Sequence, residues 1–134
     1  MNYRYIPFVL LVVLLVSAFR IAPGTSDPWK APKEADALVD PLANDAKAAA
    51  KGARLFSSLC WTCHGPQGKG DGPNATSLSV LPADLGSPFV QAQSNGALYW
   101  KITHGRGDMA SYEQVISREQ RWALVHYIRT LAHE

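Results

Sequence analysis

The chain has 134 residues, a length that allows one small domain with appended segments. Its 13 basic and 11 acidic residues nearly balance, so the charge gives no reason to expect a nucleic-acid partner. It contains two cysteines, Cys60 and Cys63, and no further cysteine is available for a disulfide framework. The composition therefore offers no basis for a nucleic-acid-binding protein or a disulfide-stabilised scaffold.

The first segment with a clear character is the apolar run from Ile6 to Phe19. Its fourteen residues fit the core of a signal peptide and are short for a complete membrane span. Arg4 and Arg20 flank the run, so we favour an uncleaved signal anchor, a transmembrane helix over residues 1–22, over a cleaved signal peptide. A signal anchor and a signal peptide would both place the rest of the chain, after the apolar run, outside the cytoplasm. We expect a single-pass protein of the bacterial cytoplasmic membrane, with its folded domain on the periplasmic side and the lipid bilayer as a partner.

Residues 23–43 are predicted to be a linker. They hold four of the nine prolines, carry mixed charges and show no hydrophobic period. Proline-rich segments act as semi-rigid spacers, so this one can simply connect the anchor to a domain. Trp29, Leu38 and Val39 are unusual in a purely solvated spacer, and docking against a larger partner is the alternative.

A first helix is expected to begin after Asn44 or Asp45 and to run into Cys60. Its apolar residues recur with helical spacing, which predicts one buried stripe made of Gly52, Leu55, Phe56 and Leu59. A glycine inside a helix costs about 1 kcal/mol relative to alanine. The position of Gly52 on the buried stripe is therefore explained best by a close crossing with another helix.

Two more helices and a long irregular stretch follow. Residues 95–104 form the next predicted helix, with Gly105 as its stop signal. The final helix begins at Ser117, which fits a capping box with Gln120. Residues 65–94 lie between the first two helices and are rich in glycine and proline. Loops of this length are uncommon in compact domains, so we expect a flat apolar cofactor to replace part of the protein core.

The chemistry of the chain centres on Cys60-Trp61-Thr62-Cys63-His64, a Cys-x-x-Cys-His pattern typical of c-type haem attachment. Residues three apart on a helical turn point the same way, so Cys60 and Cys63 can both form thioethers with one porphyrin. His64 can then offer a nitrogen to the iron. A zinc site would need a second ligand pair at suitable spacing, and a thioredoxin-like exchanger would need a preceding strand. Neither is evident in the sequence.

Met109 is the candidate for a second axial ligand. It is the only methionine besides Met1, and it lies in a glycine-rich turn between two predicted helices. The alternatives are a packing role for Met109 and ligation by His104. Ligation by His and Met raises the reduction potential relative to two histidines.

From about residue 44 to 132 the chain resembles a class I monohaem cytochrome c. The residues that carry this resemblance are Lys51-Gly52 and Phe56, the Cys60–His64 motif, Gly72-Pro73-Asn74, Pro82-Ala83-Asp84-Leu85, Met109, Trp122 and Tyr127-Ile128-Arg129. The resemblance implies an all-α cytochrome c fold over residues 44–134, with three main helices and long loops around one covalent haem c. It also implies that Gly52 and an aromatic residue of the first helix cross the last helix.

The same resemblance assigns roles to individual residues. It makes the carbonyl of Pro73 the acceptor of the His64 imidazole N–H, and it makes Met109 the second iron ligand. Trp100, Tyr99 and Arg106 are candidates for haem propionate contacts, with ordinary packing as the alternative for Trp100 and Tyr99. The family commonly has proline after the methionine, whereas this chain has Ala110, so the stiffness of the ligand loop is in question.

The resemblance implies a one-electron carrier rather than an enzyme, because two axial ligands leave no open iron site. The layout resembles monohaem subunits of bacterial respiratory complexes, of the alternative complex III type. We expect partners among membrane-embedded redox subunits and other cytochromes or a cupredoxin. The alternative is a haem-based sensor or gas-binding cytochrome in which Met109 is displaceable.

Overall fold

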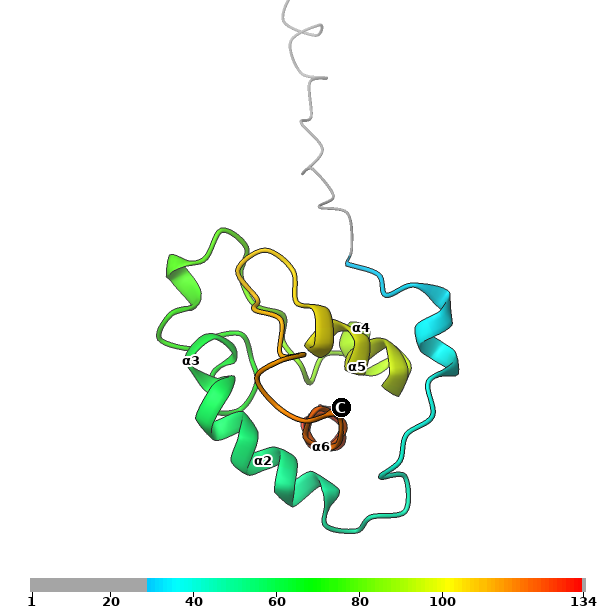
Figure 1. The fold of residues 1–134 in the computed structure, drawn as a ribbon. Coiled ribbons are helices and arrows are strands. Elements are labelled where there is room, and N and C mark those ends of the chain that lie inside the picture. Colours follow the sequence, from blue (N-terminus) through cyan, green and yellow to red (C-terminus); the bar gives the residue numbers. More distant parts are fainter. Residues whose placement is uncertain (1–28, 134) are drawn as a thin grey trace, which may run out of the picture.

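The structure, a computed structural model, describes residues 29–133 of the chain (Figure 1). Its three main helices are α2 (Ala48–Leu59), α5 (Asn95–His104) and α6 (Arg118–Arg129). The short elements are the helices α3 (Trp61–His64) and α4 (Pro88–Gln91) and the 3₁₀ helices η3 (Lys33–Ala37) and η4 (Ala75–Ser77). Within residues 29–133 the only β pairing is an isolated bridge between Arg106 and Met109. The predicted all-α class with three main helices is confirmed for this part of the chain.

Helix α2 begins three residues after the predicted cap region. Asp45 still serves its first turn, because one carboxylate oxygen accepts the Lys47 N–H at 2.8 Å and the other accepts Lys51 Nζ at 2.9 Å. The helix then continues to Leu59, and the Cys60 N–H donates to the carbonyl of Phe56. The prediction that this helix leads directly into the cysteine motif is confirmed.

Helices α2 and α6 cross steeply: α6 is seen end-on in Figure 1, while α2 runs across the view. Gly52 lies at the crossing, where an added Cβ would come within 2.0 Å of the Ala123 carbonyl oxygen. Beside it, the rings of Phe56 and Tyr127 pack with their centroids 5.1 Å apart. The close crossing predicted from Gly52 is therefore confirmed.

Helix α5 occupies the predicted residues 95–104, and α6 begins directly after the predicted cap residue Ser117. Ser94 caps α5 by accepting the Ala97 N–H at 3.0 Å, and Gly105 ends this helix with φ of +65°. Ser117 caps α6 by accepting the Gln120 N–H at 3.1 Å, and the Gln120 side chain accepts the Ser117 N–H at 2.8 Å. The capping box is thus formed on both sides, which stabilises the start of α6.

The core lies where α5 and α6 meet. Trp122 is fully buried on α6 and stacks on Tyr99 of α5, with ring centroids 4.3 Å apart. The Tyr99 hydroxyl accepts a hydrogen bond from the guanidinium of the neighbouring Arg121 at 3.1 Å. Offset stacking adds to the burial of apolar area. Tyr99 is therefore a packing residue that joins α5 to α6.

Residues 29–43 pack on the domain, in contrast to the free spacer that their composition suggested. Ala35 and Leu42 are buried, and η3 fits so closely against α5 that a Cβ at Gly96 would meet the Ala35 carbonyl oxygen at 1.8 Å. Asp40 pairs with His126 of α6 at 2.9 Å. The division into segments 1–22, 23–43 and 44–134 stays a prediction, and its first segment lies outside the described residues.

The expected membrane localisation needs correction. Among residues 29–133, no helix combines the length and the apolar character that crossing a bilayer requires. The transmembrane helix expected at residues 1–22 lies outside the described residues, so the structure gives it no support. The single-pass localisation drawn from that segment is accordingly withdrawn.

Candidate haem site

The Cys60–His64 motif occupies a sharp helical turn at the end of α2. Cys60 ends α2 and precedes α3, whose first turn is closed by the His64 N–H donating to the Cys60 carbonyl at 3.0 Å. Gly65, with φ of +77°, ends the turn. Both cysteines are free and half-buried. Burial and the neighbouring Cys63 raise the pKa of the Cys60 thiol to about 11, so it is held as a thiol.

His64 is oriented by a hydrogen bond to the backbone. Its Nδ1 lies 3.4 Å from the carbonyl oxygen of Ala83. A carbonyl only accepts hydrogen bonds, so the proton of a neutral imidazole is on Nδ1 and the lone pair is on Nε2. Burial lowers the pKa of His64, although the Ala83 contact partly offsets it. The residue therefore presents a neutral ring with Nε2 available for a metal.

The position of Ala83 corrects the role predicted for Pro73. Pro73 is exposed, and the acceptor of the imidazole N–H is Ala83, ten residues later in the chain. Two glycines explain this path. A Cβ at Gly72 would lie 2.5 Å from the Thr62 carbonyl oxygen, and one at Gly70 would lie 2.2 Å from that of Pro82. The segment around Gly72 thus packs on the backbone of the motif, and the later segment reaches His64.

Met109 lies in the loop that connects α5 with α6. It is half-buried and packs against the hydrophobic core, as do Tyr112 and Ile116 of the same loop. The rival ligand His104 is exposed, and its Nδ1 lies 2.8 Å from the Trp100 carbonyl while its ring stacks on the Trp100 ring. The structure thus turns His104 toward its own helix and leaves Met109 at the edge of the core.

Trp100 and Arg106, two of the residues predicted to contact propionates, lie on α5 and just after it. Trp100 is half-buried and stacks on His104 with ring centroids 4.4 Å apart, and Arg106 is exposed. Lys101, the neighbour of Trp100, instead extends over the Trp29 ring at 5.3 Å. The propionate roles of Trp100 and Arg106 stay predictions.

The donor set suits a haem better than a bare metal ion. Two thiols, a neutral imidazole nitrogen and a thioether are soft or borderline donors, and Met109 packs against the hydrophobic core. Within residues 29–133, no group of three or more His, Cys, Asp and Glu residues could hold a metal by itself. The zinc alternative therefore gains no support from the described structure.

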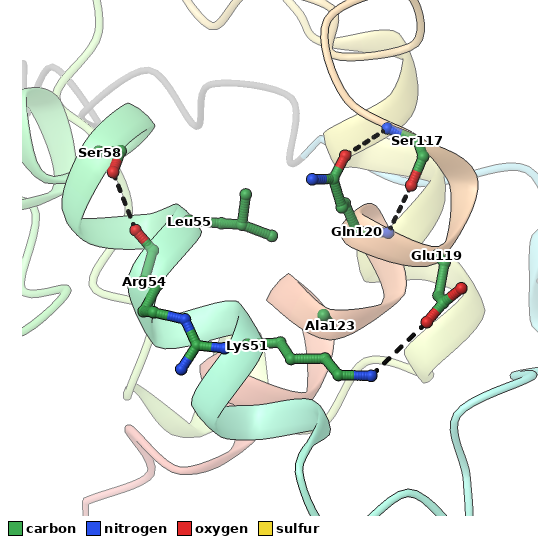
Figure 2. A pocket seen from close by; sticks show the side chains of 8 residues that line it. All are labelled: Lys51, Arg54, Leu55, Ser58, Ser117, Glu119, Gln120 and Ala123. Atoms are coloured by element: carbon green, nitrogen blue, oxygen red, sulfur yellow. Dashed lines mark hydrogen bonds and ion pairs between the residues drawn. The ribbon is translucent and has the colours of Figure 1, made fainter.

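A groove between α2 and α6 is separate from these residues (Figure 2). Six of its eight lining residues are polar or charged, and the Lys51 ammonium lies 3.7 Å from the Glu119 carboxylate across it. The lining residues are Lys51, Arg54, Leu55, Ser58, Ser117, Glu119, Gln120 and Ala123, and none of them is a candidate haem-attachment or iron-ligand residue. We do not assign the cofactor to this groove.

A helical fold with a Cys-x-x-Cys-His turn, an oriented histidine and a methionine on a distant loop defines a c-type cytochrome domain. Residues 47–128 match the family described as cytochrome c oxidase, cbb3-type, subunit III, and the chain belongs to this family. No curated protein matches the chain.

One solved structure extends the comparison. The chain is similar to a chain of the Kuenenia stuttgartiensis reducing HAO-like protein complex Kustc0457/Kustc0458, with a TM-score of 0.63 and 27% identity. The match covers 86% of this chain and 53% of the other, so the chain spans about half the length of that relative. The family membership makes this chain a c-type cytochrome domain with covalent haem c and a function in electron transfer.

Proposed function

We propose that the chain is a one-electron carrier with a single haem c, attached through Cys60 and Cys63 and ligated by His64 and Met109. The observation that carries the proposal is the hydrogen bond from His64 Nδ1 to Ala83, because it leaves Nε2 free to bind iron. Met109 supports it as the only thioether in the described part of the chain, half-buried at the edge of the core.

Each of these residues has a distinct task. Cys60 and Cys63 would hold the porphyrin by thioether bonds, and both come from one helical turn. The Ala83 carbonyl fixes the tautomer and direction of the His64 ring and makes Nε2 more basic. Met109 would supply a thioether ligand to the iron, which would raise the reduction potential and keep small molecules from the iron. The bound haem supplies the exchange of one electron between Fe(III) and Fe(II).

We further propose that the chain transfers this electron within a redox complex. The similar Kuenenia chain belongs to a complex named for two proteins, which supports a partner of the redox-enzyme class. Alternative complex III remains a hypothesis from the sequence layout. Purification of the full chain at native expression level, followed by mass spectrometry of copurifying proteins, tests transfer within a redox complex and identifies the complex. A redox enzyme should copurify with the chain. Recovery of the chain alone would contradict the proposal.

Spectroscopy of the purified holoprotein tests the cofactor. The reduced-minus-oxidised spectrum should show a c-type α band, and the pyridine haemochrome assay should give one covalent haem per chain. Replacement of both Cys60 and Cys63 by alanine should abolish covalent attachment. A holoprotein without a c-type α band would refute the central assignment.

The second ligand is tested separately. Met109→Ala should abolish the near-infrared sulfur-to-iron band and allow carbon monoxide to bind the reduced protein. Ile116→Ala is a matched control, because Ile116 is a half-buried apolar residue of the same loop that also packs against the core. Survival of the band in Met109→Ala would refute the ligand assignment, and ready binding of carbon monoxide by the unmodified protein would favour a gas-binding function.

A further inference from the structure

The tip of the Met109 loop is tied to a distant segment of the chain. Asp108, the residue before Met109, accepts two hydrogen bonds from Ser79, which lies 29 residues earlier. The Ser79 backbone N–H donates to Oδ2 of Asp108 at 2.7 Å, and the Ser79 hydroxyl donates to the same oxygen. Hydrogen bonds to an ionised carboxylate are stronger than those between neutral groups.

The other contacts of this loop act at its base. Gly105 starts it with φ of +65°, and a Cβ there would meet the Met109 carbonyl oxygen at 2.3 Å. Arg106 and Met109 exchange backbone hydrogen bonds of 2.9 and 3.0 Å. Gly107, at the tip, has nothing within 4 Å of its Cβ position. Asp108 therefore supplies the tie between the open tip and the rest of the domain.

The segment that holds Asp108 also reaches the other candidate ligand. Ser79 contacts the Met109 loop, and Ala83, four residues later, accepts the hydrogen bond of His64 Nδ1. Residues 79–83 thus touch the loop of one proposed axial ligand at one end and the ring of the other at the opposite end. The two ligands come from separate elements, α3 and the α5–α6 loop, and this short segment connects them.

We propose that the Ser79–Asp108 contact positions Met109 for iron ligation, as a clamp on the residue that precedes the ligand. The inference rests on the proposed role of Met109. Ala110 leaves the backbone after the ligand unrestrained by a proline ring, and the clamp restrains the residue before it. Ser79 and Asp108 are positioning residues and do not themselves touch the iron.

Removal of the clamp should loosen the ligand without detaching the haem. Loss of charge-assisted hydrogen bonds should raise the population with Met109 released by about tenfold. We therefore expect Asp108→Ala to weaken the near-infrared sulfur-to-iron band, to speed carbon monoxide binding to the reduced holoprotein by about tenfold, and to lower the reduction potential. Ser79→Ala keeps the backbone N–H donor, so its effect should have the same direction and a smaller size.

The controls separate the clamp from general damage. Glu113→Ala removes an exposed carboxylate from the same loop, and Thr76→Ala removes an exposed hydroxyl close to Ser79 in the chain; both should leave all three readouts unchanged. The double variant Ser79→Ala/Asp108→Ala should behave like Asp108→Ala alone, because both single changes break one interaction. The haem content and the α band of every variant should match those of the unmodified holoprotein. If Asp108→Ala does not fold, Ser79→Ala alone tests the clamp.

Two outcomes distinguish failure of the clamp proposal from failure of the Met109 ligand assignment. In the first outcome, the unmodified holoprotein has the near-infrared band, and Asp108→Ala and Ser79→Ala keep the full band and bind carbon monoxide as slowly as Glu113→Ala. The clamp is then refuted, and ligation by Met109 stands. If the unmodified holoprotein lacks the band, Met109 is not the ligand, and both the ligand assignment and the clamp are refuted.

Discussion

Substitution of Gly52 by alanine tests the helix crossing that carries the haem motif. An added Cβ would lie 2.0 Å from the Ala123 carbonyl oxygen and 2.8 Å from the Tyr127 Cβ. An alanine methyl group has no torsion that could relieve these contacts, so α2 and α6 must separate by about 1 Å to restore van der Waals distances. Such a shift would also loosen the ring contact between Phe56 and Tyr127.

The expected magnitude combines two opposing effects. Alanine gains about 1 kcal/mol over glycine in a helix interior. Overpacking of a close backbone contact costs about 1–3 kcal/mol and occasionally more, and the short distance to Ala123 puts Gly52 at the upper end. We therefore expect Gly52→Ala to lower the free energy of unfolding by about 2 kcal/mol, which lowers Tm by about 10 °C in a domain of this size.

Thermal unfolding of the holoprotein, followed by far-ultraviolet circular dichroism, measures this change. Ala50→Gly is the matched control, because Ala50 is exposed on the same helix and the change reverses the propensity effect alone. It should lower the free energy of unfolding by about 1 kcal/mol. If Gly52→Ala melts at or above the temperature of the unmodified protein, the close crossing does not explain the glycine.

Two further predictions concern contacts made by α6 and by the residues that follow it. Arg121→Leu should lower the free energy of unfolding by about 3 kcal/mol in urea titrations, because the Arg121 guanidinium donates to three carbonyls in residues 112–116 at 2.7–3.2 Å; an effect no larger than that of an exposed residue such as Arg118 would contradict this. Burial acts to raise the pKa of Asp84, but the Gly86 N–H and His133 outweigh it and hold that pKa below 3.8. The ionised Asp84 carboxylate and its contacts thus stabilise the fold above about pH 4. This contribution is lost as the pH falls through the lowered pKa that Asp84 has in the folded state. Asp84→Asn should flatten the decline in stability below pH 4, and an unchanged pH dependence would refute the assignment.

Local chemistry explains why the helices were predictable. The limits of α5 and the start of α6 follow from Ser94, Gly105 and the pair Ser117 and Gln120, whose side chains or backbone satisfy the nearest helix termini. The role of Gly52 was also predictable, because a glycine on an apolar helical stripe has few explanations. These features need no knowledge of residues far away in the chain.

The packing of residues 29–43 was not predictable in the same way. Proline content and the lack of a hydrophobic period are typical of a spacer. Its contacts are long-range: Asp40 meets His126 across 86 residues, and Leu42 joins a core built mainly by α5 and α6. Only the assembled domain offers a surface for this segment. The hydrogen-bond acceptor of His64 was unpredictable for the same reason. Every residue has a backbone carbonyl, and only the folded chain shows that the carbonyl of Ala83, and not that of Pro73, reaches the imidazole.

The contacts around Met109 separate stability from ligand position. After the ligand, the Tyr112 hydroxyl donates to the Leu59 carbonyl at 3.1 Å, and the buried Arg121 holds the carbonyls that follow. These partly buried bonds should dominate the stability of the loop. The exposed contact of Ser79 with Asp108 restrains the open tip of the loop, and the tip can open without unfolding the rest of the domain, so its loss should change the ligand position more than the Tm. A Ser79 variant with an altered near-infrared band and an unchanged Tm is therefore the signature of a positioning contact, whereas parallel losses of both would indicate a contact that merely stabilises the fold.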